Sequence, residues 1–152
     1  AQENGLRLTA QKSMRVLFSR KRSIHFKPGV QLYGQCLSGN AEHKFLGLIL
    51  DTKLTFVSHV KYLKNKCTRA MNILKVLSRS LWGSDKKCLM NSYKSLIRTR
   101  LDYGAITYQS GTLTSLKMLD PVRHLGIHLS TSAFRTVSME SLYVESNEWS
   151  LL

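Results

Sequence analysis

The chain has 152 residues, of which 43% are hydrophobic and 21% charged, and its formal net charge is +14. This hydrophobic content suffices for one core of ordinary size and excludes a chain that is disordered throughout. The longest clean apolar run, residues 45–50, is broken by Gly47 and falls far short of the roughly twenty residues of a membrane span, so no membrane partner is expected.

The basic residues are unevenly distributed along the chain. Residues 1–50 contain 8 Lys and Arg against 2 Asp and Glu, residues 51–100 contain 12 against 2, and residues 101–152 contain 3 against 5. These segments therefore carry net charges of +6, +10 and −2. A positive charge of this size opposes compaction unless a polyanion neutralises it, which predicts a nucleic-acid partner.

The first residues and the cysteines indicate the setting of the protein. The chain begins with Ala1 rather than Met, and Asn4-Gly5 is typical of the end of a helix that begins upstream, which indicates a piece of a longer protein. The three cysteines are odd in number and far apart in sequence, which favours reduced thiols over a disulfide framework. With no secretory signal visible, we expect an intracellular location.

Residues 12–18 begin an extended first third. Met14, Val16 and Phe18 alternate along this segment and would lie on one side of a half-buried strand. The basic residues at 20–22 would then form the turn that ends it.

Two further extended segments follow. Residues 30–32 and 36–37 suggest an antiparallel pair joined by a turn near Tyr33, which is an unfavourable residue if the turn needs positive φ. Residues 44–50 are nearly all apolar, which predicts a strand covered on both faces. Gly47 would mark a bulge or the close approach of another backbone.

The apolar periodicity changes at Phe56. From there apolar residues recur at alternating steps of four and three, typical of an amphipathic helix packed on a neighbour. At about 100° per residue, Lys61, Lys64, Lys75 and Arg79 fall within about 60° of one another on one flank. Such rows also occur on ordinary solvated helices, but here almost no acids alternate with the bases. The apolar stripe comprises Phe56, Val60, Leu63, Cys67, Ala70, Leu74 and Leu77.

A second helix is predicted from an N-cap at Ser84 to about Asp102. Asp120-Pro121 predicts the start of another helix, and residues 140–145 predict a short last one. The expected architecture is α+β, a small antiparallel sheet fragment followed by a helical subdomain. In the second helix the inward residues are Leu89, Tyr93, Leu96, Ile97 and Leu101, and the outer basic residues are Lys86, Lys87, Lys94, Arg98 and Arg100.

Short motifs occur in order along the whole chain. They are Gly5-Leu6-Arg7-Leu8, Lys12-Ser13, Phe45-Leu46-Gly47-Leu48 with Asp51, Lys53-Leu54-Thr55-Phe56, Leu77-Ser78, Trp82-Gly83, Leu101-Asp102-Tyr103-Gly104, Ala133-Phe134-Arg135-Thr136 and Glu140-Ser141-Leu142. In this order and spacing they resemble the C-terminal part of the reverse transcriptase of non-LTR (LINE-type, jockey-like) retrotransposons. Each motif is weak alone, and their common register makes the resemblance specific.

The resemblance implies a position within a right-hand polymerase. Residues 1–52 would be a partial palm, with the motif D strand after Lys12 and the primer-grip hairpin, motif E, leading into Phe45-Leu46-Gly47. Residues 53–152 would be the thumb and the region after it. The implied partners are an RNA template, a DNA primer, and the upstream fingers and palm of the same polyprotein, in a nuclear or cytoplasmic ribonucleoprotein.

The resemblance also implies that the catalytic carboxylates lie upstream. The family holds two metal ions with an aspartate of motif A and an Asp-Asp pair of motif C, and this chain has neither Asp-Asp nor Asp-x-Asp. We therefore expect no cofactor in this fragment, two Mg ions only in the complete polymerase, and no polymerase activity from the fragment alone. Lys12 is a candidate proton donor to the leaving pyrophosphate, and an ordinary surface lysine is an equally good interpretation.

Three positions depart from the family pattern. Tyr33 replaces an asparagine of the palm hairpin, Val137-Ser138 replaces a Ser-Pro helix start, and Trp149 replaces a proline. Each departure would cost a cap or a turn preference of about 1 kcal/mol. Such losses fit either a decayed copy or variation between lineages.

Other functions find less support in the residues. His124 and His128 share a helix face, but they lack the accompanying ligands of a zinc site. Two alternatives stay open, a non-enzymatic module that binds RNA or an RNA-DNA hybrid, and a decayed remnant with only a protein-interaction surface. The candidate nucleic-acid-binding residues are Phe45, Leu46, Gly47, Lys61, Lys64, Lys75, Arg79, Lys86, Lys87, Lys94 and Arg98.

Overall fold

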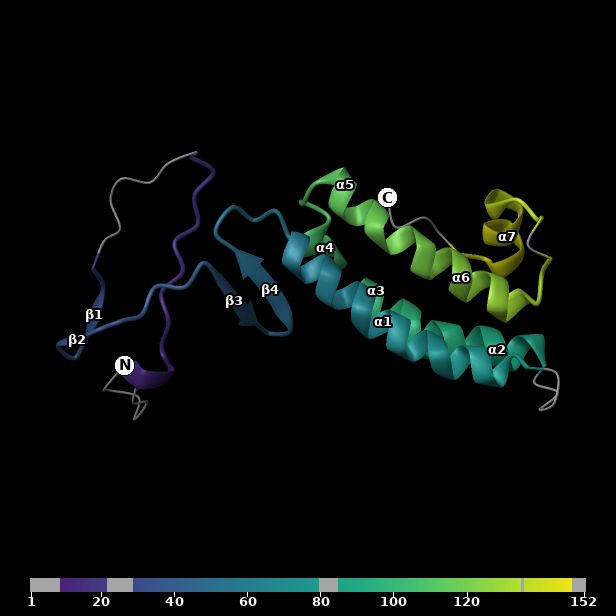
Figure 1. The fold of residues 1–152 in the computed structure, drawn as a ribbon, viewed down its shortest axis with the longest axis horizontal. Coiled ribbons are helices and arrows are strands. Elements are labelled where there is room, and N and C mark those ends of the chain that lie inside the picture. The colour runs from purple at the N-terminus through teal and green to yellow at the C-terminus, as the bar shows by residue number, and fades with distance from the viewer. Residues whose placement is uncertain (1–8, 22–28, 80–84, 135, 149–152) are drawn as a thin grey trace. The chain divides into compact units, whose positions relative to one another are not determined.

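The computed structural model describes residues 9–21, 29–79, 85–134 and 136–148. Two small antiparallel hairpins precede a set of helices (Figure 1), so the chain is α+β, as predicted. The chain divides into two compact units, Ala1–Leu54 and Thr55–Leu152. None of the helices in the described ranges combines the length and the apolar character that crossing a membrane requires.

The first hairpin confirms the predicted pair of short strands. β1 (Gln31–Leu32) pairs antiparallel with β2 (Gln35–Cys36). Tyr33 and Gly34 form the two-residue turn with φ angles of 51° and 76°. Two positive φ angles are the requirement of a type I′ turn, which Asn-Gly fulfils best. Tyr33 therefore occupies a conformation that is unfavourable for its side chain.

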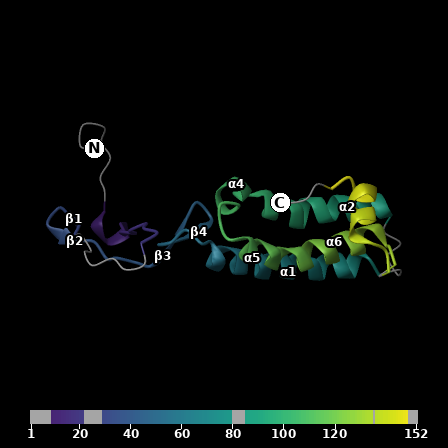
Figure 2. The same cartoon turned by 90° about the horizontal axis from the view of Figure 1, so that it is seen from above.

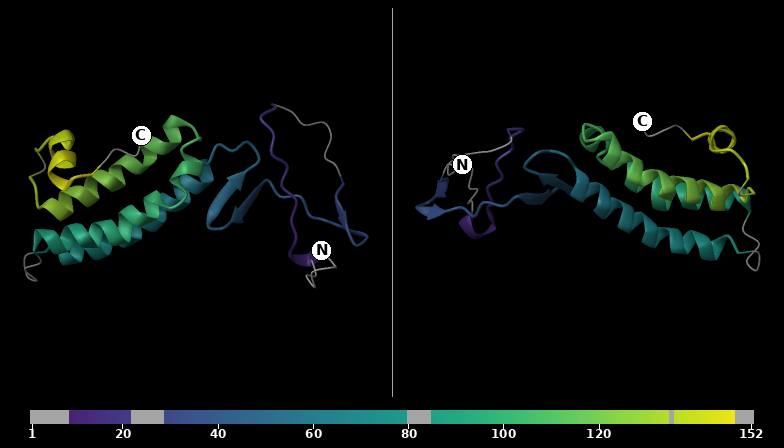
Figure 3. Two further views of the ribbon diagram at one scale, coloured as in Figure 1. Left: turned by 180° about the vertical axis from the view of Figure 1, so that it is seen from behind. Right: turned by 45° about the horizontal axis from the view of Figure 1, so that its top comes forward.

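The second hairpin shows that the prediction of one strand over residues 44–50 was wrong. β3 (Glu42–Phe45) pairs antiparallel with β4 (Leu48–Asp51), as Figure 3 shows. Leu46 and Gly47 form the turn, with φ angles of 45° and 84°. Gly47 thus supplies the second residue of a tight turn rather than a bulge. Because the chain reverses there, Phe45 and Leu46 are exposed instead of covered on both faces.

The strand predicted over residues 12–18 is also absent from the described chain. Ala10–Lys12 form one turn of 3-10 helix, and Arg15 makes a single parallel bridge with Gly39. The Arg15 amide donates to the Ser38 carbonyl at 3.0 Å, and the Arg15 carbonyl accepts from the Asn40 amide at 3.0 Å. Alternating apolar residues cannot form a half-buried strand without a longer partner, so Met14 and Phe18 stay exposed.

The second unit is helical. α1 (Val57–Leu77) is followed by α2 (Lys86–Tyr93), a π-helical turn η3 (Lys94–Arg98) and α3 (Thr99–Asp102), which continue one another. This composite helix returns beside α1, and α6 (Asp120–Thr131) packs on both (Figures 1 and 2). The remaining elements are α4 (Ala105–Tyr108), α5 (Leu113–Leu116), the 3-10 turn η4 (Lys117–Leu119) and α7 (Met139–Ser146), which packs on α6.

Helix α1 confirms the predicted apolar stripe. Phe56, Val60, Leu63, Cys67, Ala70 and Leu74 are all buried, and Leu77 is half-buried. His59 and Met71 are also buried against the neighbouring helices, so the buried face is wider than the stripe.

The π-helical turn follows from the spacing of the apolar residues in the second helix. Leu89, Tyr93, Ile97 and Leu101 are buried and recur at steps of four. On an ideal α-helix each such step drifts by about 40°, so the last of them would leave the core face. The i→i+5 bonds of a π turn accommodate an extra residue, which keeps all four residues on one side.

Helix α6 begins in a different way from the prediction. The helical path starts at α5, where Thr112 is the N-cap and its hydroxyl accepts from the Ser115 amide at 3.4 Å. It continues through η4 into α6, with Pro121 in the first turn of α6. Pro121 has no N–H to donate to the preceding turn, which fits the 3-10 geometry of η4 immediately before it.

Gly126 allows α6 to approach α2 and α1 closely. A Cβ atom at position 126 would lie 2.4 Å from Cε2 of Tyr93 and 3.4 Å from Cε of Met71. Tyr93 is itself fully buried. Any side chain at position 126 would therefore displace the Tyr93 ring from the core.

We expect Gly126→Ala to destabilise the helical unit by about 2 kcal/mol, because the overpacking outweighs the higher helix propensity of alanine. Chemical denaturation followed by circular dichroism measures the change. Gly29→Ala is the control, since its added Cβ would meet nothing within 4 Å. Tyr93→Leu combined with Gly126→Ala should recover part of the loss, and a stabilised Gly126→Ala single variant would contradict the tight contact.

Cysteine reactivity provides a second check on the fold. Cys67 is fully buried, and burial raises the pKa of its thiol to about 11 against the opposing influence of Arg100 and Lys66. Cys36 and Cys88 are exposed. At pH 8 we expect iodoacetamide to label Cys36 and Cys88 and to reach Cys67 only after unfolding. Mass spectrometry that found Cys67 labelled as fast as the other two would show that its burial is wrong.

Candidate nucleic-acid interface

The predicted basic row lies on the outer part of α1. Lys61 and Lys75 are exposed, Lys64 is half-buried, and Arg79 is exposed just beyond the end of the helix. Within the described ranges none of these four cations makes an ion pair. Their charges are therefore not neutralised by the carboxylates that the structure describes.

A second group of cations lies on the other flank of α1. Lys66 is about 180° around the helix from Lys75, and Arg69 lies between the two flanks. From α3, Arg100 reaches across and donates through Nη1 to the Lys66 carbonyl at 3.3 Å. Lys66 Nζ lies 5.9 Å from the centre of the Tyr62 ring. Sequence reasoning missed Lys66 and Arg69, because they fall outside the 60° row and only the position of α3 gives them a neighbour.

Neutral polar residues separate the two groups of cations. Asn65, Thr68 and Asn72 are exposed, and the Thr68 hydroxyl donates to the Lys64 carbonyl at 2.8 Å. Together these residues form a cationic surface along α1, which we call the α1 basic face. It comprises Lys61, Lys64, Asn65, Lys66, Thr68, Arg69, Asn72, Lys75 and Arg79.

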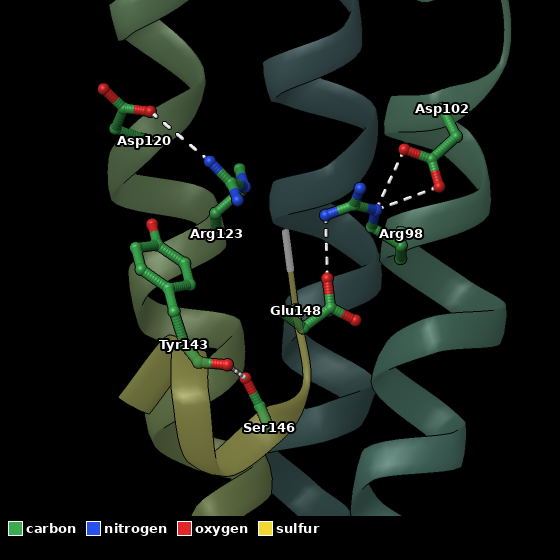
Figure 4. A network of polar contacts seen from close by, with 7 residues as sticks. All are labelled: Arg98, Asp102, Asp120, Arg123, Tyr143, Ser146 and Glu148. Atoms are coloured by element: carbon green, nitrogen blue, oxygen red, sulfur yellow. Dashed lines mark hydrogen bonds and ion pairs between the residues drawn. The ribbon is translucent and has the colours of Figure 1, made fainter. Parts of the chain in front are cut away.

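The outer residues of the second helix are less available than predicted. Lys87 is exposed and Lys94 half-buried, but Lys86 forms an ion pair with Glu145 of α7. Arg98 is paired with two carboxylates, as Figure 4 shows. Its Nε lies 2.9 Å from Asp102, and its Nη1 lies 2.7 Å from Glu148. The placement of Arg98 among the nucleic-acid-binding residues is therefore corrected, because its guanidinium serves the protein interior.

Arg123 forms the other half of the polar cluster in Figure 4. Its side chain is only 2% exposed, and its Nη1 lies 4.0 Å from Asp120. The guanidinium carbon lies 5.1 Å from the centre of the Tyr143 ring, within the range of a cation–π interaction. Ser146 donates through its hydroxyl to the Tyr143 carbonyl at 3.3 Å. Arg123 therefore holds α7 on α6 and is not part of a surface for phosphate.

The two histidines of α6 do not belong to a metal centre in the described part of the chain. His124 packs edge-on against Tyr143 with a centroid distance of 6.2 Å, and burial lowers the pKa of its imidazole. Among the described residues, no group of three or more His, Cys, Asp and Glu is placed to hold a metal ion.

The candidate residues of the first unit lie at two separate places. Phe45, Leu46 and Gly47 form the tip of the β3–β4 hairpin, where Phe45 is 59% and Leu46 72% exposed. The prediction placed a hairpin before these residues, whereas they make the turn itself. Lys12 is exposed at the end of its 3-10 turn.

Two of the three departures from the family pattern lie in the described residues. Tyr33 takes the strained turn position, as anticipated. At Val137-Ser138 the expected loss of a cap was wrong, because the Ser138 hydroxyl accepts from the Ser141 amide at 3.3 Å and caps α7. Trp149, like the cap predicted at Ser84, lies outside the described residues.

Curated proteins show what this chain is related to. The Retrovirus-related Pol polyprotein from type-1 retrotransposable element R1 of Bradysia coprophila is 27% identical over 148 residues, which cover 95% of this chain. The RNA-directed DNA polymerase from mobile element jockey of Drosophila melanogaster is 30% identical over 112 residues, or 71% of this chain. The chain is a homologue of the R1 and jockey non-LTR retrotransposon polyproteins. No protein-family model and no solved structure matches it significantly.

This homologue is much shorter than its relatives. It spans 15% of the Bradysia polyprotein and 12% of the Drosophila polymerase. A further R1 polyprotein, from Nasonia vitripennis, is 28% identical over 116 residues and is covered over 29% of its length. The alignment with the Bradysia protein runs through both compact units, so the relationship includes the hairpins and the helices.

The buried ion pair between Arg98 and Glu148 predicts a sharp difference between two glutamates. Glu148 is only 5% exposed, so Glu148→Gln should lower the free energy of unfolding by about 2 kcal/mol, because it leaves a shielded guanidinium with one carboxylate. Glu140→Gln is the matched control, since Glu140 is exposed in the first turn of α7. Thermal unfolding compares the two variants, and equal stabilities would show that the pair contributes nothing.

Proposed function

We propose that this chain is a fragment of an RNA-directed DNA polymerase of a non-LTR retrotransposon, and that its helical unit grips the template-primer duplex. The homology to the R1 and jockey proteins supports the polymerase origin. The observation that carries the gripping role is the α1 basic face, whose cations make no ion pair within the described ranges. A nucleic-acid backbone would neutralise them.

The length of the basic row suits a phosphate backbone. From Lys61 to Lys75 the helix rises by about 21 Å, at 1.5 Å per residue. At 3.4 Å per phosphate along one strand of a duplex, this length corresponds to roughly six phosphates. Lysine side chains are long and flexible, so they can follow a backbone that curves away from the helix axis. These contacts would position a duplex without reading its sequence.

In this proposal the fragment binds but does not catalyse. The carboxylates that hold two Mg ions would belong to the upstream palm, since this sequence has no Asp-Asp pair. The first unit would be the remainder of that palm, with the β3–β4 hairpin tip at the primer, and the second unit would be the thumb. The role of Lys12 as a proton donor stays a prediction that only the complete polymerase can test.

The proposal predicts a specific change in salt dependence. Replacing Lys61, Lys64, Lys75 and Arg79 by Gln should flatten the log–log dependence of affinity on salt for an RNA–DNA hybrid, by up to about 0.9 per cation. Fluorescence anisotropy over a salt series measures this slope. For single changes, Lys117→Gln is the control for Lys75→Gln, because both lysines are exposed and each change removes one charge.

An unchanged slope in the fourfold variant would remove α1 from the interface. Binding that is independent of salt would favour the remnant with only an apolar interaction surface, since apolar association releases no counterions. Metal-dependent primer extension by the purified chain would contradict the predicted inactivity.

A further inference from the structure

Carboxylates of the last helix cover cations of the second helix. We call residues 139–148, which are α7 with the two residues after it, the α7 segment. Glu145 of this segment pairs with Lys86 of α2, and Glu148 pairs with Arg98 of η3. These two carboxylates therefore neutralise two of the cations that the sequence assigned to nucleic acid.

We propose that the α7 segment is an acidic mask, which keeps the phosphate backbone off the α2–η3 surface and thereby confines the duplex to the α1 basic face. This inference rests on the proposed function and assigns the segment a role in setting the edge of the interface.

The spacing of the two pairs supports this role. Lys86 and Arg98 are twelve residues apart, or about 18 Å along a helix axis. Glu145 and Glu148 are three residues apart and can be separated by no more than about 11 Å. The two long cationic side chains therefore converge on the α7 segment from both sides. A short acidic segment thus neutralises cations over a much longer stretch of the α2–η3 surface.

The α7 segment is anchored without these two pairs. Leu142 is fully buried, and Arg123 lies over the Tyr143 ring (Figure 4). The Ser138 cap fixes the first turn of α7. Removal of one carboxylate from the surface should therefore expose its cation and leave the segment in place.

The two pairs differ in how firmly they exclude a phosphate. The side chains of Lys86 and Glu145 are 49% and 48% exposed, so solvent and salt screen this pair. Arg98 and Glu148 are 19% and 5% exposed, and Asp102 occupies further donors of the guanidinium. A phosphate could reach Arg98 only by displacing a buried carboxylate. Lys86 is therefore the cation whose unmasking can be tested without damage to the fold.

The test compares Glu145→Gln with Glu140→Gln, which remove the same charge from the same helix. The probe is an RNA–DNA hybrid, and the readout is the log–log slope of affinity against salt. We expect Glu145→Gln to steepen the slope by up to about 0.9, as one further phosphate contact forms at Lys86, and Glu140→Gln to leave it close to wild type. Lys86→Gln should be silent in the wild-type chain and should abolish the gain of Glu145→Gln.

Equal slopes for the two glutamate variants would overturn the mask, and so would a Lys86→Gln variant that weakens the wild-type chain. The result for the fourfold variant of the α1 basic face separates this failure from that of the proposed function. If that variant loses slope while Glu145→Gln changes nothing, only the mask is wrong. If the wild-type chain shows no salt-dependent binding to the hybrid, both proposals fail.

Discussion

The contact between Gly126 and the ring of Tyr93 allows the helical unit to close. Because position 126 has no side chain, α6 comes near enough to pack on α1 and α2 together. Tyr93 is fully buried in this contact, and burial raises the pKa of its phenol. Once α6 is fixed, Arg123 is held in the position from which it carries Tyr143 and with it α7. The arrangement of four helices thus depends on one close approach between two of them.

Charge is partitioned within this unit. The few carboxylates near the C-terminal end are used against Lys86 and Arg98. The cations of α1 receive no such partners within the described ranges. The surplus of positive charge in the composition is therefore concentrated on one helix face, where a polyanion would encounter it.

The sequence was sufficient for α1 because its apolar residues follow the α-helical repeat closely. It was insufficient at Gly47, where a glycine in an apolar run fits a bulge and a tight turn equally well, and only the pairing of β3 with β4 decides between them. It also misplaced Arg98, since a wheel drawn for an uninterrupted α-helix does not represent the π turn or a carboxylate fifty residues away. Local periodicity determines helices, whereas the availability of a charge is a tertiary property.

The π turn has a consequence for how such a chain can diverge. It corresponds to one extra residue within an otherwise regular helix, and losing that residue would rotate everything after it by about 100° relative to α2. A single-codon deletion in Lys94–Arg98 would thus change which side chains of α3 face the core. Relatives aligned residue by residue across this turn can therefore differ in the direction of an equivalent arginine, even where the amino acid itself is unchanged.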